Sequence, residues 1–453
     1  MELADRSHRF GCGPAAAPAP AAGLFRCRER PIARSRRRRP RREAGRRDPS
    51  ATLATLATGE PETADVRIER LASGGEGVGR LADGLTIFVP QSAPGDLVSV
   101  YVTERRRRHA RGEIVRLLES GSARVTPPCP VFGRCGGCAW QHVDYTQQLV
   151  SKQTILRDAM QRIGRIPLAE LPTIVASPSA YAYRGRTRLL ERDGAVGYRE
   201  RGSHALCALR ACPILMPELD RRLGVLADEV AASVQPGERE WELALGRPGD
   251  VRATSLASGQ APSPADRIAL EVGIDTLELS PGTFAQGNSM LLDMLHQTVC
   301  SRVGEGDSLL ELFAGAGFFS LALARCFAHV QLVESDAGAV EDLRANLSRA
   351  GLMNVVVTPL CAEVAIPDRI ERVPDVVLLD PPRAGLDPAV LRCLAALDPD
   401  RIVYLSCDPA TLARDVARLL PHGFVLRSLE GFDLFPQTPH VEALAVLVRE
   451  DVA

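Results

Sequence analysis

The chain has 453 residues, of which 45% are apolar and 25% charged, and both fractions are ordinary for a globular protein. At roughly 150 residues per domain, this length allows about three domains with buried cores. The 55 basic and 56 acidic residues give a formal charge of −1, which excludes a uniformly basic nucleic-acid coat, and no uncharged apolar run reaches the roughly 18 residues of a membrane span.

The first 60 residues form a basic leader, with 14 arginines against 6 acidic residues. They are rich in Ala, Pro and Arg and lack periodic large apolar residues, so they cannot bury enough surface to offset chain entropy. We therefore predict that residues 1–62 are disordered. A transit peptide, an RNA-binding tail and an extended start without function all fit this composition, whereas prolines within the apolar stretch 15–25 argue against a secretory signal.

Residues 63–120 alternate short apolar runs with glycine-rich turns. The expected strands are at 66–71, 86–90 and 96–102, and a glycine-dense connection lies at 73–80. This pattern of short strands separated by glycine-rich turns predicts a small antiparallel β-barrel. Arginines at 105–108 and 111 would line one edge of it, which favours binding of single-stranded nucleic acid; a solvated hairpin is the alternative.

Three of the twelve cysteines, Cys129, Cys135 and Cys138, follow a C-x5-C-x2-C spacing with a Gly-Gly pair that lets the backbone curl inward. Three thiols this close predict a metal or iron–sulfur loop, which needs a fourth thiolate to close. Cys212, followed by proline, is the better candidate and Cys207 the competitor. The spacing does not separate zinc from a [4Fe–4S] cluster, and incidental cysteines are the alternative. Free thiols without a secretory signal indicate a reducing cytosol, so we expect a cytoplasmic protein.

After residue 280, strands and helices alternate, which predicts an α/β domain with a mostly parallel sheet. A strand at 308–313 turns at Gly315 and Gly317 into a helix expected at 321–326, and a second strand at 330–333 ends at Glu334. An acid at that point can accept hydrogen bonds from the ribose hydroxyls of an adenosine-type cofactor. Ser320 stands where a third glycine would favour a dinucleotide, so the pattern favours S-adenosylmethionine.

Two later strands also end in chemically useful residues. Residues 374–379 are an expected apolar strand that ends at Asp380, followed by a rigid Pro-Pro turn. Asp380 would then lie at the sheet edge where open α/β folds bind ligands. Residues 402–406 lead into Cys407, after which Asp408 suits the N-cap and Pro409 the first position of a helix. A helix N-terminus favours thiolate over thiol, so we predict that Cys407 is a nucleophile with a lowered pKa. A buried cysteine at a strand end is the alternative.

Together these motifs resemble the RNA uracil-5-methyltransferase family over residues 63–453. The resemblance implies a TRAM-type, OB-like β-barrel at 63–120, a central domain with [4Fe–4S] cysteines at 121–280, and a Rossmann-like methyltransferase domain at 281–453. The matching segments are G-x-F-x-Q-x-N at 282–288, L-E-L-F at 310–313, D-P-P-R at 380–383, S-C-D-P at 406–409 and F-P-Q-T-P-H-V-E at 435–442. The chain departs from the family at Ala314, where cysteine is common, and at Phe318, where asparagine is frequent.

The resemblance assigns roles to these residues. Cys407 would add to C6 of uracil and make C5 nucleophilic, and Glu442 would remove the C5 proton after methyl transfer. His440 would order its motif. The residues implied for S-adenosylmethionine are Gln286, Phe313, Gly315, Gly317, Glu334 and Asp380, with Gln286 and Asp380 holding the cofactor amine, the uracil edge, or both. The ligands implied for a [4Fe–4S] cluster are Cys129, Cys135, Cys138 and Cys212.

The same resemblance indicates the substrate class. Cluster cysteines combined with a TRAM-like region are typical of the branch that modifies 23S rRNA, and a tRNA substrate is the alternative. We expect a monomer with no membrane partner. Two rivals stay open: an amino-methyltransferase acting on adenine or a protein amide, and a non-catalytic iron–sulfur RNA-binding factor. Neither would need Cys407 and Glu442.

Overall fold

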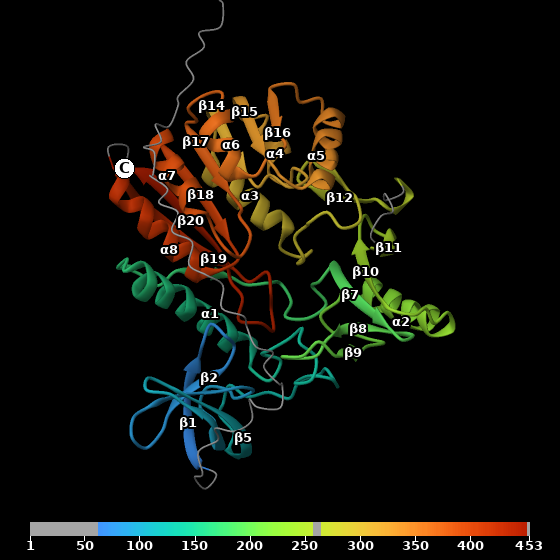
Figure 1. Cartoon of the computed structure of the whole chain (residues 1–453), viewed down its shortest axis with the longest axis vertical. Coiled ribbons are helices and arrows are strands. Elements are labelled where there is room, and N and C mark those ends of the chain that lie inside the picture. Colours follow the sequence, from blue (N-terminus) through green and yellow to red (C-terminus); the bar gives the residue numbers. More distant parts are fainter. Residues whose placement is uncertain (1–61, 257–263, 451–453) are drawn as a thin grey trace, which may run out of the picture.

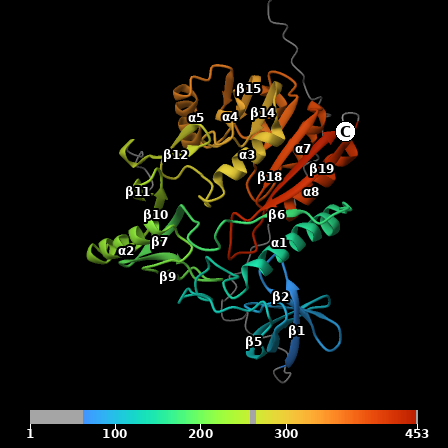
Figure 2. The same ribbon diagram turned by 180° about the vertical axis from the view of Figure 1, so that it is seen from behind.

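The computed structural model describes residues 62–256 and 264–450, so the predicted disorder of the leader lies outside the described residues. A β-barrel occupies one end of the molecule and an α/β domain the other (Figure 1). Between them lies a central segment, and helix α1 (Tyr145–Ala159) passes beneath the α/β domain, as the view from behind also shows (Figure 2). No helix among the described residues is both long and apolar enough to cross a membrane.

The predicted barrel is confirmed as a closed five-stranded barrel in the order β1-β2-β3-β5-β4. Its core is filled by residues that face inward at alternate positions along the strands, among them Val66, Ile68 and Val98. The barrel is not wholly antiparallel as predicted, because β3 and β5 pair in parallel where the chain closes on itself. The strands are β1 (Thr63–Leu71), β2 (Gly77–Arg80), β3 (Thr86–Val89), β4 (Leu97–Arg105) and β5 (Ala110–Glu119).

The α/β domain is built on an eight-stranded sheet in the order β16-β15-β14-β17-β18-β20-β19-β6. The strands from β16 to β18 pair in parallel, as predicted, and β20 runs antiparallel to both of its neighbours. Strand β6, far away in the sequence, adds to the edge beside β19. The strands are β6 (Thr173–Val175), β14 (Gly306–Leu312), β15 (Phe327–Val333), β16 (Val355–Thr358), β17 (Val376–Leu379), β18 (Arg401–Ser406), β19 (Phe424–Phe432) and β20 (Glu442–Arg449).

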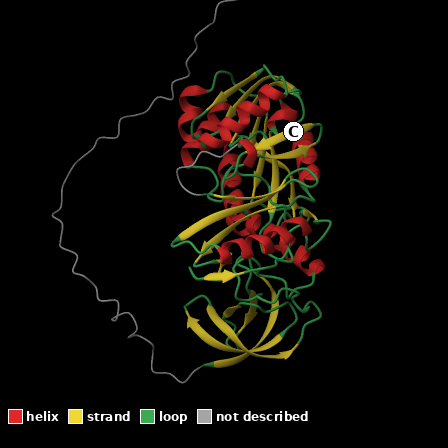
Figure 3. Cartoon of the chain, turned by 90° about the vertical axis from the view of Figure 1, so that its right-hand side faces the viewer, coloured by secondary structure: helices red, strands yellow, loops and turns green. Residues whose placement is uncertain are grey.

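Helices cover both faces of this sheet, seen edge-on in Figure 3. One apolar core takes residues from α3 (Leu292–Val303), α4 (Ser320–Leu323) and α5 (Ala337–Arg349). The opposite core takes residues from α1, α6 (Ala362–Arg369), α7 (Pro388–Leu397) and α8 (Pro409–Leu419). The helix predicted at 321–326 is shorter than expected, since α4 ends at Leu323. Strand β15 already begins at Phe327, opposite Gly306, so residues 324–326 are needed as a turn.

The central segment contributes a five-stranded antiparallel sheet in the order β11-β10-β7-β8-β9, against which α2 (Pro217–Ala232) packs. A hairpin of β12 and β13 joins the apolar core on one face of the α/β sheet. The strands are β7 (Arg186–Arg192), β8 (Ala195–Arg199), β9 (Leu206–Ala208), β10 (Glu238–Leu245), β11 (Val251–Ser255), β12 (Ile268–Val272) and β13 (Asp275–Leu279). Short π and 3-10 turns lie at Met160–Gly164, Pro264–Asp266 and Leu420–His422.

Candidate active site

The order of the strands brings the sequence-predicted residues of the α/β domain to one sheet edge. Strands β15, β14, β17 and β18 are parallel neighbours, so their carboxyl ends share that edge. The residues that follow these strands are, in the same order, Glu334, the turn from Phe313 to Gly317, Asp380 and Cys407. Strand β20 begins at Glu442, and the pairing of Ser406 with Ala443 puts Glu442 level with Cys407.

The glycine turn after β14 is shaped for close approach of a ligand. Phe313, Gly315 and Gly317 all have positive φ, at 64°, 56° and 98°. A Cβ added at Gly315 would meet no atom within 4 Å, so the turn exposes bare backbone to open space. Glu334 supports this shape by accepting hydrogen bonds from the backbone N–H of Gly315 at 2.9 Å and of Asp336 at 2.7 Å. Such a turn with an acid beside it fits the adenosine part of the predicted cofactor.

Buried acids make this edge of the sheet a cation-favouring environment. Burial raises the pKa of Glu311 to about 8 even though the Ser320 hydroxyl donates to it at 2.7 Å, and the charges of Asp380 and Glu334 add to the rise. Burial also raises the pKa of Asp380. Because opposite charge stabilises ionised carboxylates, a positively charged ligand fits this group of acids. Glu311 belongs to the L-E-L-F motif at 310–313, but the sequence predicted no individual role for it.

Cys407 lies directly before a capped helix, as predicted. The Asp408 carboxylate accepts hydrogen bonds from the backbone N–H of Ala410 at 2.8 Å and Thr411 at 3.0 Å, and α8 starts at Pro409. The predicted lowering of the Cys407 pKa is wrong. Burial, then the negative charges of Glu442 and Asp380, raise the pKa of the thiol to about 11, and the Arg383 guanidinium opposes them only in part. Desolvation and two acids outweigh the single helix terminus.

Glu442 has the environment of a base with an unusually high proton affinity. It is 2% exposed, and burial followed by the charge of Asp380 raises its pKa well above the ordinary range of a carboxyl. His440 is different, because burial and the neighbouring Arg383 lower its pKa to about 4. Its Nε2 lies 3.3 Å from a guanidinium nitrogen of Arg383, so it is a neutral ring that accepts from Arg383. That contact agrees with an ordering role for His440.

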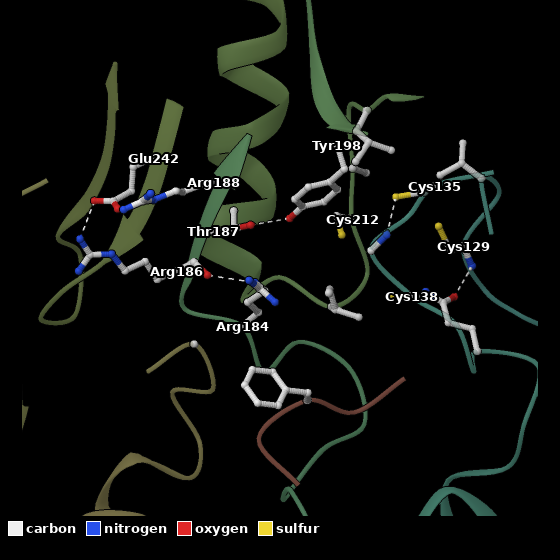
Figure 4. Close-up of a pocket in the computed structure, with 18 of the residues that line it drawn as sticks. Cys129, Cys135, Cys138, Arg184, Arg186, Thr187, Arg188, Tyr198, Cys212 and Glu242 are labelled. Carbon is white, nitrogen blue, oxygen red and sulfur yellow. Dashed lines mark hydrogen bonds and ion pairs between the residues drawn. The ribbon is translucent and has the colours of Figure 1, made fainter. Parts of the chain in front are cut away.

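The four cysteines predicted to act together line one cavity of about 530 Å³, which Gln286 and Phe435 also line (Figure 4). Burial, then the nearby Cys138, Cys129 and Cys135, raises the pKa of the Cys212 thiol to about 12. Cys207 does not line the cavity and instead receives the Nε–H of Arg134 at 3.5 Å. Within the described ranges, no three His, Cys, Asp or Glu side chains are grouped so as to hold a metal ion.

The far end of the same cavity is lined by residues that the sequence reasoning missed. Arg184, Arg186 and Arg188 alternate along the chain and line this cavity together (Figure 4). Arg188 donates to the Gly282 carbonyl at 2.6 Å and so fixes the start of the loop that carries Gln286, while Arg186 pairs with Glu242 at 2.7 Å. The i, i+2, i+4 spacing of the arginines was the available signal.

Phe284, part of the motif at 282–288, is another cavity residue for which the sequence predicted no role. It belongs to the same loop, lines the cavity, and is 71% exposed. A large aromatic side chain left in solvent beside arginines offers a surface on which a nucleobase can stack.

Comparison with known proteins gives a consistent result over nearly the whole described chain. The family described as tRNA (Uracil-5-)-methyltransferase matches residues 276–450, and the TRAM domain matches residues 60–115. A 23S rRNA (uracil(1939)-C(5))-methyltransferase of Chromohalobacter salexigens is 33% identical, over 92% of this chain and 94% of its own. An uncharacterized RNA methyltransferase of Thermosynechococcus vestitus is 34% identical, over 85% of this chain and 98% of its own.

One solved structure is similar along most of the chain. It is the Pyrococcus abyssi tRNA (uracil-54, C5)-methyltransferase in complex with S-adenosyl-L-homocysteine. It aligns with a TM-score of 0.66 and 25% identity, and the match covers 85% of this chain and all of that one. The fold similarity therefore includes the α/β domain and much of the remaining chain.

The surroundings of Cys407 predict how its thiol titrates. Alkylation of Cys407 by iodoacetamide, followed by mass spectrometry of its peptide, should accelerate as pH rises toward about 11, since only the thiolate reacts. Glu442→Gln should lower the apparent pKa, because it removes the negative charge that most disfavours the thiolate after burial. Glu341→Gln, at an exposed position on α5, is the control and should leave the profile unchanged. An apparent pKa below 8 in the unaltered protein would contradict this electrostatic account.

Proposed function

Because the chain belongs to the tRNA (uracil-5-)-methyltransferase family and is thus an S-adenosylmethionine-dependent RNA uracil-5-methyltransferase, we propose that it methylates a uridine of 23S rRNA through a covalent bond from Cys407. The observation that carries the mechanism is the position of Cys407 level with Glu442, beside Asp380, at the cofactor edge of the sheet. The relative named for 23S rRNA, which spans 92% of this chain, supports the choice of substrate. The tRNA enzyme of Pyrococcus abyssi makes tRNA the second candidate.

In the proposed reaction, the chain first activates its nucleophile. The Cys407 thiol must give up its proton, and the ionised form of Asp380 is the proposed acceptor, which leaves the Glu442 carboxylate free for the later C5 proton. The thiolate then forms a bond to C6 of a uracil flipped out of its stack, and the electron pair of the ring double bond makes C5 an enolate carbon. The turn from Phe313 to Gly317 and Glu334 would hold S-adenosylmethionine, which would supply the methyl group for C5 and leave as S-adenosyl-L-homocysteine.

Glu442 completes the reaction in this proposal. Its carboxylate takes the proton from C5, the electrons of that C–H bond restore the C5–C6 double bond, and the C6–S bond breaks to return the Cys407 thiolate. A carboxylate of ordinary pKa is a weak base for a carbon acid, so the burial that raises the pKa of Glu442 suits this step. Gln286 lines the cavity that the four cysteines also line, and the resemblance to the family implies that it hydrogen-bonds the uracil or the cofactor.

We also infer that Cys129, Cys135, Cys138 and Cys212 hold a [4Fe–4S] cluster. All four line one cavity, and the backbone N–H of Gly137 points at the Cys135 sulfur at 3.4 Å, a type of hydrogen bond that iron–sulfur clusters receive. A four-iron cluster is wider than one ion, so its ligands surround it without converging on a single point. When bound, the cluster supplies a cross-link between the loop at 129–138 and Cys212.

The barrel is the proposed contact to the RNA backbone. At the tip of the β4–β5 hairpin, Arg107 and Arg108 are exposed, and neither forms an ion pair within the described part of the chain. Arg105, Arg106 and Arg111 instead pair with acids of the barrel. Arg107 and Arg108 are therefore available to phosphates.

The substrate is tested by mapping 5-methyluridine in a strain that lacks the gene. We expect one 5-methyluridine to disappear from 23S rRNA while tRNA is unchanged, and a plasmid copy of the unaltered gene to restore it. A copy with Cys407→Ala should not restore the modification. Loss of 5-methyluridine from tRNA alone would establish the second candidate, and unchanged uridine methylation with loss of a methylated adenine would favour the amino-methyltransferase.

The separate roles of Cys407 and Glu442 can be tested with two variants. Cys407→Ala should abolish both turnover and RNA adducts while S-adenosylmethionine still binds, because the attacking atom is gone. Glu442→Gln should lower turnover on the order of 10²–10⁴-fold and accumulate a methylated protein–RNA adduct on denaturing gels, because elimination lacks its base. RNA containing 5-fluorouridine should trap the unaltered enzyme in the same way, since fluorine cannot leave as a cation. Near-normal turnover of Cys407→Ala would refute the covalent route.

The cluster ligands can be tested with a matched pair of buried cysteines, Cys212 at 8% and Cys207 at 0% exposure. Anaerobically purified protein should contain about four irons per chain and absorb broadly in the visible range. Cys212→Ala should lose iron and absorbance, and Cys207→Ala should keep both. Stoichiometric zinc without iron in the unaltered protein would rule out the iron–sulfur assignment.

A further inference from the structure

Lys152 is the chain's single lysine among 55 basic residues, and it lies in the interior. Its side chain and that of Asp433 are both 0% exposed and form an ion pair. The Lys152 ammonium also donates to the Phe435 carbonyl at 2.9 Å. One cation thus holds both ends of the turn Asp433–Phe435, the first part of the connection from β19 to β20.

The other 54 residues in the count of lysine plus arginine are all arginine. The site itself gives a physical reason for the exception. The ammonium lies 5.9 Å from the centroid of the buried Trp140 ring and is enclosed by the connection, so only a compact cationic head has room. An arginine would bring a larger planar fork with five donors, whereas the compact ammonium donates to Asp433 Oδ1 and to the Phe435 carbonyl.

The connection at 433–441 leads directly to the proposed base. Phe432, at the end of β19, pairs with Glu442 at the start of β20, so Asp433 is one residue from the position opposite the base. Further along, Gln437 has a positive φ of 67° and exchanges hydrogen bonds of 2.9 Å with the side chain of Gln148, which precedes Lys152 by one helical turn. Helix α1 therefore holds the connection at two points, of which Lys152 is the charged one.

The charge of Lys152 also reaches the active site. After burial and Arg383, it is the next contributor that lowers the pKa of His440, two residues before Glu442. On its other side, α1 shares an apolar core with α8, the helix that starts beside Cys407. Lys152 therefore lies on α1, which packs against α8 beside the proposed nucleophile. Its ammonium binds the connection that ends at Glu442.

We propose that Lys152 is a positioning residue that sets Glu442 relative to the C5 proton of the adduct. The inference rests on the proposed function. The step affected is the one in which the Glu442 carboxylate takes the C5 proton, the double bond re-forms, and the C6–S bond breaks to release the thiolate. Attack by Cys407 does not require that alignment. Loss of Lys152 should thus slow elimination more than adduct formation.

The test compares Lys152→Met with Asp433→Asn, which breaks the same ion pair from the other side. Both should bind S-adenosyl-L-homocysteine with unchanged affinity and form the adduct with 5-fluorouridine 23S rRNA transcripts at close to the rate of the unaltered enzyme. On ordinary transcripts, kcat should fall on the order of 10²-fold with little change in KM, and a methylated adduct should accumulate. Arg162→Met, a 67% exposed cation just after α1, is the matched control and should behave as the unaltered protein.

Failure of the proposed function and failure of the proposed role of Lys152 would give different results. If the unaltered enzyme forms no adduct with either transcript, the proposed function is wrong in its substrate or in its covalent mechanism. If the unaltered enzyme forms its adduct but both variants turn over normally, or lose cofactor binding, adduct formation and turnover in equal measure, Lys152 does not position the base. Lys152→Arg should not restore turnover, because its fork is too large, and full restoration would contradict the steric argument.

Discussion

The connection between β19 and β20 is buried, and its backbone polar groups must find partners away from water. Those partners come from parts of the chain that are distant in sequence. The Gln437 carbonyl accepts from the backbone N–H of both Ala139 and Trp140 at 2.9 Å, and Tyr183 donates to the Pro436 carbonyl at 2.9 Å. Since the same connection ends at Glu442, the need to satisfy its hydrogen bonds also fixes the proposed base.

Trp140 extends this constraint to the barrel. Its indole N–H donates to the Gly75 carbonyl in the β1–β2 turn at 3.0 Å, while its backbone contacts the connection. Because Trp140 follows Cys138 by two residues, the barrel, the cysteine loop and the base segment meet at one buried side chain. The loop of Gln286 is held by another long-range bond, from the Gly185 N–H to the Gly287 carbonyl at 3.0 Å. A cluster bound by the cysteines would stabilise the segment around Trp140, which holds the connection to the proposed base.

The parts of the site that depend on local chemistry were predictable from the sequence. Strand ends, the glycine turn and the Asp408 cap depend on neighbouring residues, and the structure has them where expected. The parts set by packing between distant segments were not. Nothing near β6 indicates that it joins the α/β sheet beside β19, and nothing near Lys152 indicates its partner 281 residues away. The predicted lowering of the Cys407 pKa was wrong for the same reason, because Glu442 and Asp380, which raise it, come from other strands.

The raised pKa of Cys407 and that of Glu442 have one origin, which links the two halves of the proposed reaction. Desolvation at the sheet edge penalises every negative charge there, so the resting site favours a neutral thiol and protonated acids. In the proposed complex, a positively charged cofactor near Glu311 and Asp380 would reverse part of that penalty, since an adjacent cation favours the ionised forms. The nucleophile would then gain reactivity when the methyl donor is in place, while burial keeps Glu442 basic enough for the final proton transfer. A buried acid cluster can in this way delay thiolate formation until the complex is assembled.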